Sequence, residues 1–253
     1  MRFFKEYRLL FGRAVRGSLR NPVWLFLGLF QPALYLLLFA PLLQGLSSVP
    51  GFPRGGAYSV FTPGLLVMIA LFGTAYAGFG LVDQIRAGVV ERLLVTPARR
   101  LAILLGYVTR DVVVLLVQSC IIVGIALPLG LSVSLPGLLV TFAMMVLTGT
   151  LMASCSYALA LLLKREDSLA SVLNTVASPL LLLSGITLPL TLAPKIIRSM
   201  ASVNPFAYEV TASRSLFLGN FTDSAILVAV LFLGSLALLA FIWAARSFRK
   251  GTA

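Results

Sequence analysis

Histidine is absent from this 253-residue chain, and only eight residues are acidic. The absence of histidine excludes Ser–His and Cys–His catalysis and most metal sites, because imidazole is a common general base and metal ligand. The acids are scattered along the chain and do not form a plausible carboxylate active site. No G-x-x-x-x-G-K-[ST] loop occurs, so this phosphate-binding motif is missing as well. We therefore expect no catalytic residue, metal or cofactor in this chain.

Charged residues and cysteines are also scarce. Charged residues make up 11% of the chain, against about 25% in typical globular domains. Hydrophobic residues make up 59%, and the mean hydropathy is +1.02. A soluble core cannot use that much apolar surface, so we predict an all-α membrane protein with residues 1–253 in a single transmembrane domain. The net charge of +12 comes from cations that flank apolar runs, which indicates membrane topology rather than nucleic-acid binding. Cys120 and Cys155 fall inside those runs and are interpreted as packing residues.

Six transmembrane helices are predicted from the uncharged stretches, since a bilayer core about 30 Å thick takes about 20 helical residues. The uncharged run 112–163 is too long for one helix, and Pro128, Gly130 and Pro136 divide it with a short turn. The predicted spans are 23–43, 63–82, 112–131, 136–163, 168–190 and 224–245.

The segment 191–222, between the last two spans, is moderately apolar and rich in proline. Two short helices are expected there, at Pro194–Ser202 and Phe206–Leu218, and neither is long enough to cross a bilayer. We predict that they enter the membrane from outside and return, as a re-entrant segment, with the backbone buried in protein or lining water.

Most of the 20 basic residues fall on one predicted side of the membrane. Six precede the first span, five lie between spans 2 and 3, two between spans 4 and 5, and three follow span 6. The positive-inside rule therefore places both termini in the cytoplasm. Only four basic residues fall on the other side: Arg54, Lys195, Arg198 and Arg214.

Residues 1–20 are predicted to form an amphipathic helix in the membrane interface, with Phe3, Tyr7 and Leu10 on one face and cations around it. A plain positive anchor for the first span is the alternative. The apolar run that follows is longer than that of a cleaved signal peptide, so no cleavage is expected.

An island of charge lies between spans 2 and 3, at residues 83–100 (DQIRAGVVERLLVTPARR). Its apolar residues recur at the spacing of one helical face, and Pro97 is expected to end the helix. One interpretation is an ordinary basic loop, and the other is a helix that docks on a soluble partner. The apolar face comprises Val89, Val90, Leu93, Leu94 and Pro97, whereas Glu91, Arg92 and Arg99 lie off it.

Polar residues are sparse inside the predicted spans. A polar side chain at membrane depth usually faces protein or a cavity, so these residues either bond neighbouring helices or line a path. No acid is expected in the middle of a span, which argues against a proton- or sodium-coupled transporter. The polar residues concerned are Gln31 and Tyr35 in span 1 and Asn174, Thr175 and Ser178 in span 5.

Three motifs resemble the permease subunit of ABC-2-type ABC exporters, a group with drug, polysaccharide and lipo-oligosaccharide permeases. FQPALYLLLFAPLL (30–43) is similar to the first span of that family, and ERLLVTPARR (91–100) to its cytoplasmic coupling helix. SGITLPL (184–190) and NPFAYEVTASRSLFLG (204–219) resemble its span 5 end and re-entrant segment. Asp83, Arg86 and Gly88-Val89 stand where many members have a Glu-Arg or Glu-Lys pair and Gly-Thr.

The resemblance implies a multi-pass permease in a bacterial cytoplasmic (inner) membrane, in contact with membrane lipids. It implies two permease copies, identical or paralogous, and two ABC ATPase subunits that bind the ATP and Mg. A drug-like, lipid-linked or glycan substrate would pass beside Gln31, Tyr35, Asn174, Thr175 and Ser178. A secondary transporter or channel without an ATPase is the alternative function, and a membrane-embedded lipid enzyme is a third. The residues that the resemblance assigns to ATPase coupling are Val89, Val90, Glu91, Arg92, Leu93, Leu94, Thr96, Pro97, Arg99 and Arg100.

Overall fold

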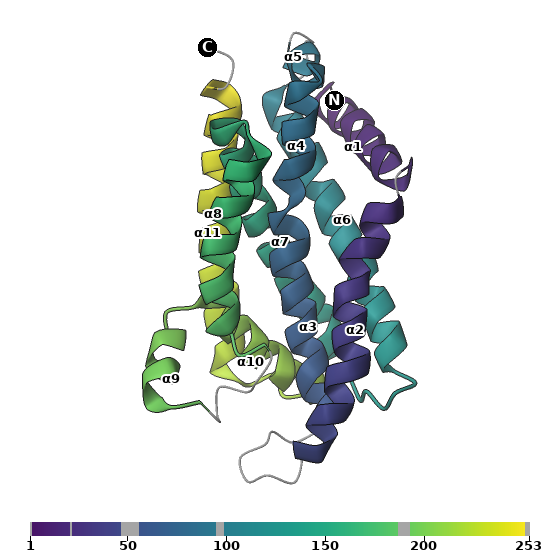
Figure 1. Ribbon diagram of the computed structural model, residues 1–253, viewed down its shortest axis with the longest axis vertical. Helices are drawn as coiled ribbons and strands as arrows, with labels where there is room; N and C mark the ends of the chain where they lie inside the picture. The colour runs from purple at the N-terminus through teal and green to yellow at the C-terminus, as the bar shows by residue number, and fades with distance from the viewer. Residues whose placement is uncertain (1, 21, 47–55, 95–98, 187–192, 251–253) are drawn as a thin grey trace.

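The computed structural model describes residues 2–20, 22–46, 56–94, 99–186 and 193–250, and every regular element within them is a helix (Figure 1). The elements are α1 (Arg2–Arg20), α2 (Pro22–Leu46), α3 (Gly56–Ala75), α4 (Ala77–Arg86), α5 (Val89–Leu94), α6 (Arg100–Ala126), α7 (Leu135–Leu163), α8 (Glu166–Leu182), α9 (Lys195–Ala201), α10 (Pro205–Phe217) and α11 (Ser224–Lys250).

Four stretches among the described residues are long and apolar enough to cross a membrane: Gly56–Arg86, Arg100–Ala126, Leu135–Leu163 and Ser224–Arg249. The all-helical, membrane-spanning class predicted from the sequence is therefore confirmed. Of the other two predicted spans, α2 contributes a shorter apolar stretch, and α8 has 17 residues. The count of six spans stays a prediction.

The stretch Gly56–Arg86, which corresponds to the second predicted span, begins earlier than predicted and is bent. Its helix α3 starts at Gly56, whereas the predicted span starts at Pro63, so Pro63 lies inside the helix. The helix then breaks at Tyr76 before α4 begins. Ser156 of α7 is inserted at this break, where its hydroxyl donates a hydrogen bond to the Ala75 carbonyl and accepts one of 2.9 Å from the Gly78 amide. A side chain that satisfies backbone groups in this way is a recognised cause of a helix kink.

Helix α7 lies at the centre of the bundle and contacts α3, α4, α6, α8, α10 and α11. Its side chains at Met145, Ala153 and Tyr157 are almost fully buried. Apolar burial of this kind contributes about 25 cal/mol per Å². One apolar cluster joins α3 to the C-terminal half of α6 and to α10, and a second joins α4, α5 and the N-terminal half of α6 to α8 and α11.

The two ends of the bundle differ in what they carry. Both chain termini and α5 lie at one end of the molecule, and α9 and α10 lie at the other (Figure 1). Helix α1 packs against α6 at the first of these ends, and it leaves Phe4 and Leu9 each 75% exposed. This exposure suits the interfacial position predicted for residues 1–20.

Helices α9 and α10 occupy the segment for which two short helices were predicted. Asn204 begins α10, since its side-chain oxygen accepts a 3.1 Å hydrogen bond from the Phe206 amide. Its amide nitrogen also donates to the Leu180 carbonyl of α8, at 2.8 Å. Towards the other end of α10, Arg214 donates to the carbonyls of Val60 and Gly185, at 2.9 and 2.8 Å. Polar side chains therefore tie α10 to α3, to α8 and to the turn that follows α8.

Candidate functional site

The candidate coupling segment follows a tight turn at the end of α4. Gly88 has a φ of +67°, a left-handed conformation that glycine adopts without steric cost, and α5 then runs from Val89 to Leu94. Thr96 and the expected stop at Pro97 lie outside the described residues. Arg99 precedes α6, and Arg100 is the first residue of that helix. The predicted 83–100 helix is thus two helices in the described part, separated by a glycine turn.

Val90 packs inside its own chain. It is 7% exposed and belongs to the apolar cluster that contains Leu81 and Val82 of α4. In one interpretation of the sequence, Val90 lies on the apolar face of a helix that docks on a soluble partner. In the chain by itself Val90 instead packs against α4, because the short α5 needs an apolar contact to hold it there. Arg92 is exposed and Val89 is partly buried. The side chains of Glu91, Leu93 and Leu94 lie outside the described part.

Three polar contacts tie the ends of this segment to other helices. Arg86 forms an exposed ion pair of 2.5 Å with Glu166 of α8. The Arg99 amide donates a 3.1 Å hydrogen bond to the Glu6 carboxylate of α1. Arg100 donates to the Arg249 carbonyl of α11, at 2.7 Å. Exposed pairs contribute under about 1 kcal/mol each, so these contacts add little stability. They connect the segment to α8, α1 and α11, and a displacement of the segment therefore acts on all three helices.

Two of these partners were not predicted. Glu166 lies in the short connection between predicted spans 4 and 5, and Glu6 lies in the predicted interfacial helix, so neither is among the predicted coupling residues. Each acid pairs across a sequence distance of 80 or more residues. The only sequence signal is that both belong to a set of just eight acids.

A buried charge pair, Arg110 and Asp111, immediately precedes the predicted start of span 3 at residue 112. Arg110 donates two hydrogen bonds to one oxygen of Asp111, and Tyr157 of α7 donates to the other oxygen. Arg110 also lies over the Tyr107 ring, and Tyr107 donates to Gln84 of α4. The prediction that spans contain no internal acid is therefore wrong, because α6 begins at Arg100 and includes Asp111. The pair is tolerated because both oxygens of Asp111 accept hydrogen bonds and Arg110 also donates to the Tyr157 hydroxyl.

The residues predicted to line a path lie on the outer faces of α2 and α8. Gln31 is exposed. Tyr35 is half-buried, and its ring is nearly perpendicular to that of Phe39, with 5.4 Å between the ring centroids. Asn174 accepts a 2.8 Å hydrogen bond from the Tyr76 hydroxyl at the α3–α4 break. Thr175 and Ser178 are also exposed, and their hydroxyls bond carbonyls one turn earlier on α8.

The structure thus brings Asn174 to Tyr76. The predicted path residues of α2 and those of α8 remain on separate helices. In Figure 1, α2 and α8 flank the α3–α4 stretch, and both contact α3. Tyr76 was not predicted as part of this surface, and it is 39% exposed. Since polar groups at membrane depth usually face protein or water, the polar face of α8 is the best candidate for a path or a subunit contact.

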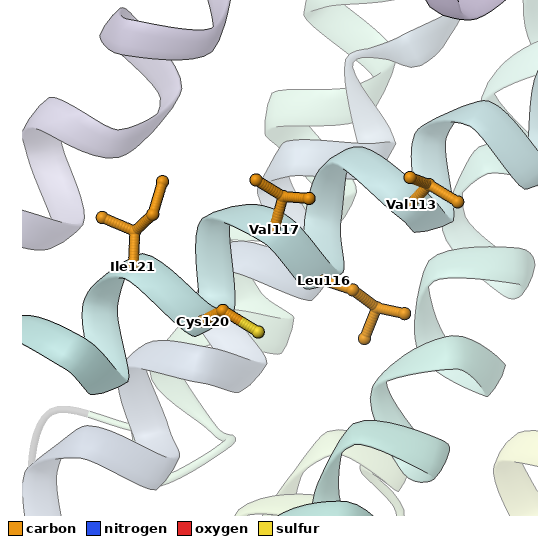
Figure 2. Close-up of a pocket in the computed structure, with 5 residues that line it drawn as sticks. All are labelled: Val113, Leu116, Val117, Cys120 and Ile121. Atoms are coloured by element: carbon orange, nitrogen blue, oxygen red, sulfur yellow. The ribbon is translucent and has the colours of Figure 1, made fainter.

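Two apolar hollows complete the surface. The first is lined by one face of α6, and its only heteroatom is the Cys120 sulfur (Figure 2). Such a hollow suits lipid and offers no catalytic group. The second lies between α2, α3 and the turn after α8, and one of its lining residues, Tyr35, is a predicted path residue. It is lined by Tyr35, Phe39, Phe61, Leu65, Met68 and Ile186.

Comparison with known proteins places these features in a family. The family model described as "ABC-2 type transporter" matches residues 5–218. The chain is 28% identical to a putative transport permease, ycf38, of Pyropia yezoensis, over 89% of this chain and 79% of the relative. It is 27% identical to the daunorubicin resistance ABC transporter permease DrrB1 of Streptomyces coeruleorubidus, over 82% and 73% of the two chains.

A third relative is the inner membrane transport permease YadH of Escherichia coli K12. It is 28% identical over 74% of this chain and 72% of the relative. The family match covers α5 and reaches through α10, so it spans the segment at one end of the bundle and the short helix at the other. With these matches and its apolar spanning helices, the chain belongs to the ABC-2 type transporter family and is a membrane transport permease.

Proposed function

We propose that this chain is the membrane subunit of an ATP-driven exporter, in which ABC ATPase subunits bind the ATP and Mg. The observation that carries the proposal is the family match over residues 5–218, which includes a short helix, α5, placed at the same end as both termini (Figure 1). A helix at that end is in a position to meet soluble subunits. ATP hydrolysis belongs to the partner, since this sequence has no Walker-type phosphate loop.

The same end is proposed to be cytoplasmic. The excess of Lys and Arg before α2, around α5 and after α11 supports this orientation. The printed name of YadH, an inner membrane permease, supports a bacterial cytoplasmic membrane. The printed name of DrrB1 refers to daunorubicin resistance, which supports export and a drug-like substrate, with lipid-linked and glycan substrates as the other classes.

A second permease copy, identical or paralogous, is proposed to face α2 and α8. Asn174, Thr175 and Ser178 are exposed on α8, and such groups facing lipid are unfavourable at membrane depth. A partner copy that covers this face would enclose the polar groups and leave a path between the two copies. The substrate would then meet Gln31 and Tyr35 on the α2 side.

Coupling would begin with closure of the two ATPase subunits on ATP. The closure displaces α5, and the contacts of Arg86, Arg99 and Arg100 pass that displacement to α8, α1 and α11. ATP thereby biases a two-state membrane element, as a ligand does when its affinity differs between the two states.

ATP hydrolysis tests this assignment directly. The purified chain is expected to hydrolyse no ATP, whereas the complex with its ATP-binding subunit should do so and lose that activity when the phosphate-loop lysine of the subunit is replaced. Turnover by the purified chain that persists after removal of contaminating ATPases would contradict the assignment.

Path variants are expected to change substrate response more than basal turnover. Asn174→Leu removes the acceptor of the Tyr76 hydrogen bond, and Gln31→Leu removes an exposed amide. Substrate-stimulated and basal ATP turnover of the reconstituted complex would be compared. Val176→Leu, an exposed apolar position on α8, is the matched control. Equal loss of both rates would show a packing role.

The proposed topology can be tested by labelling single cysteines from outside the cell, after replacing Cys120 and Cys155. Probes at Ser48 and at Asn220, an exposed position after α10 that is preferred to the buried Ala201, are expected to react with an impermeant maleimide. Probes at Ala98 and Thr252 should react only after the membrane is opened. Strong outside labelling at either of these two positions would reverse the orientation.

A further inference from the structure

The carboxyl group of Glu209 on α10 is buried at the junction with α7. The residue is 0% exposed, and one carboxylate oxygen accepts a 2.7 Å hydrogen bond from the Thr148 hydroxyl near the midpoint of α7. The other oxygen is buried and has no hydrogen-bond partner in the described structure. The hydroxyl of Ser213, one turn further along α10, is also buried without a partner. These two atoms share one side of the helix.

In the described part of the chain, no cation forms an ion pair with this carboxyl group. The helices that pack most extensively against α10 are α3, α7 and α11, and α8 meets only its start, through Leu180, far from its own charged first turn. The sequences of α3 and α7 contain no Asp, Glu, Lys or Arg, and the only charged residues of α11 lie in its last turns, at the end of the molecule away from α10 (Figure 1). Arg214, on α10 itself, donates to three backbone carbonyls.

The other titratable groups on these helices either hydrogen-bond other partners or lie elsewhere along their helices. Tyr157 of α7 donates to Asp111, and Tyr208 of α10 donates to the Ser202 carbonyl. Cys155 lies two turns along α7 from Thr148, and Tyr58 packs in the apolar cluster of α3. Asp223, after α10, accepts a hydrogen bond from Ser215. Among the described residues, Thr148 is therefore the side chain that hydrogen-bonds Glu209.

An isolated carboxylate in such surroundings is far less stable than the neutral acid, because it loses its hydration and gains no opposite charge. Burial raises the pKa of Glu209 from 4.5 to about 8, while the hydrogen bond from Thr148 lowers it. Helix α10 is not among the spanning stretches. It lies at the end of the bundle opposite the termini (Figure 1).

We propose that Glu209 is a proton-binding site that seats α10 on α7: the neutral acid holds the junction closed, and loss of its proton to solvent weakens it. When protonated, the unpartnered oxygen gains a donor for the Ser213 hydroxyl or for a water trapped between them. When ionised, the carboxylate is left with the Thr148 hydroxyl as its partner. Deprotonation therefore favours states in which α10 moves away from α7 and water reaches the group.

The sign of the pH effect follows from the raised pKa. The folded state binds the proton more tightly than the unfolded state, so the stabilisation is fully present below about pH 4.5 and declines as pH rises towards about 8. This effect is a property of the permease chain itself, so its test needs no ATPase and does not depend on the exporter assignment.

Thermal unfolding of the purified chain in lipid nanodiscs tests the site. Between about pH 5 and about pH 9, the midpoint of the wild type is expected to fall by roughly 5–10 °C more than that of Glu209→Gln. Asp167→Asn, which removes an exposed acid, is the matched control and should follow the wild type. Parallel profiles of wild type and Glu209→Gln would overturn the proposal, as would a wild-type profile that responds to sodium instead of pH.

Infrared spectroscopy provides a second measurement if Glu209→Gln folds poorly. The wild type at neutral pH should show the carbonyl band of a protonated carboxyl group, and that band should disappear on raising the pH towards about 9. Thr148→Val removes the hydrogen bond that favours the ionised form, so the band should persist to higher pH. Absence of the band from the wild type at neutral pH would contradict the proposal.

Discussion

Gly137→Ala is expected to prevent α10 from docking on α7 and to remove most of the folded protein. A methyl group at Gly137 would overlap the carbonyl oxygen of Leu216 and would lie 2.5 Å from the Ser134 hydroxyl. The Leu216 carbonyl is backbone, and it already accepts a 2.9 Å hydrogen bond from Ser134. The added carbon can be accommodated only if α10 shifts as a whole, so the cost should be about 3 kcal/mol or more.

The measurement is the yield of monodisperse protein in detergent together with its thermal midpoint. Gly124→Ala in α6 and Gly234→Ala in α11 are matched controls, because a methyl group at either position meets no atom within 4 Å. These two should be neutral or slightly stabilising, by up to about 1 kcal/mol, since alanine is the better helix former. A Gly137→Ala protein as stable as these controls would mean that α10 does not dock as described.

Val90→Asp is expected to abolish coupling to the ATPase while the chain still inserts into the membrane. Val90 is the buried contact of α5, and burying a valine side chain contributes about 1.5–3 kcal/mol, which a charged carboxylate would forfeit. The sequence pattern predicts Leu93 and Leu94 on the same apolar face as Val90, and Arg92 is exposed. Leu93→Asp should therefore resemble Val90→Asp, whereas Arg92→Ala removes only an exposed charge worth less than about 1 kcal/mol.

The readouts are pull-down of the ATP-binding subunit and transport, each normalised to the amount of permease in the membrane. Val90→Ala is the milder control, which shortens the side chain without adding charge. Glu91→Lys reverses a charge and is expected to uncouple ATP hydrolysis from transport with assembly retained. If Val90→Asp, Leu93→Asp and Glu91→Lys all assembled and transported normally, residues 89–94 would be only a connection between helices.

The helices bounded by clear sequence signals were predicted closely. The span expected at 136–163 is α7, Leu135–Leu163, because Pro136 marks its start and Lys164 ends its uncharged run. Where charge occurs inside a helix, the same logic fails. Helix α6 begins at Arg100 rather than at 112, since Arg110 and Asp111 neutralise each other and bond Tyr157. That partner is 46 residues away, and no local pattern shows it.

In the candidate site, too, local features could be predicted and contacts between helices could not. Asn174 and the position of α5 at the end with the termini follow from polarity and charge, both of which are local properties of the sequence. The contact of Asn174 with Tyr76 depends on the break between α3 and α4, which Ser156 creates from a third helix. The inward position of Val90 likewise depends on α4 folding back beside α5. Such pairings between helices are set by tertiary packing and have no signature in periodicity.

Co-purification tests the central claim most directly. The tagged chain would be extracted from its own host membranes in mild detergent, and the stoichiometry of the complex would be measured by native mass spectrometry. The account predicts two permease chains, of this type or a paralogue, with two soluble subunits that carry a phosphate loop, and dissociation of those subunits in the Val90→Asp variant. A stable complex of normal transport activity that contains no ATP-binding subunit would contradict it.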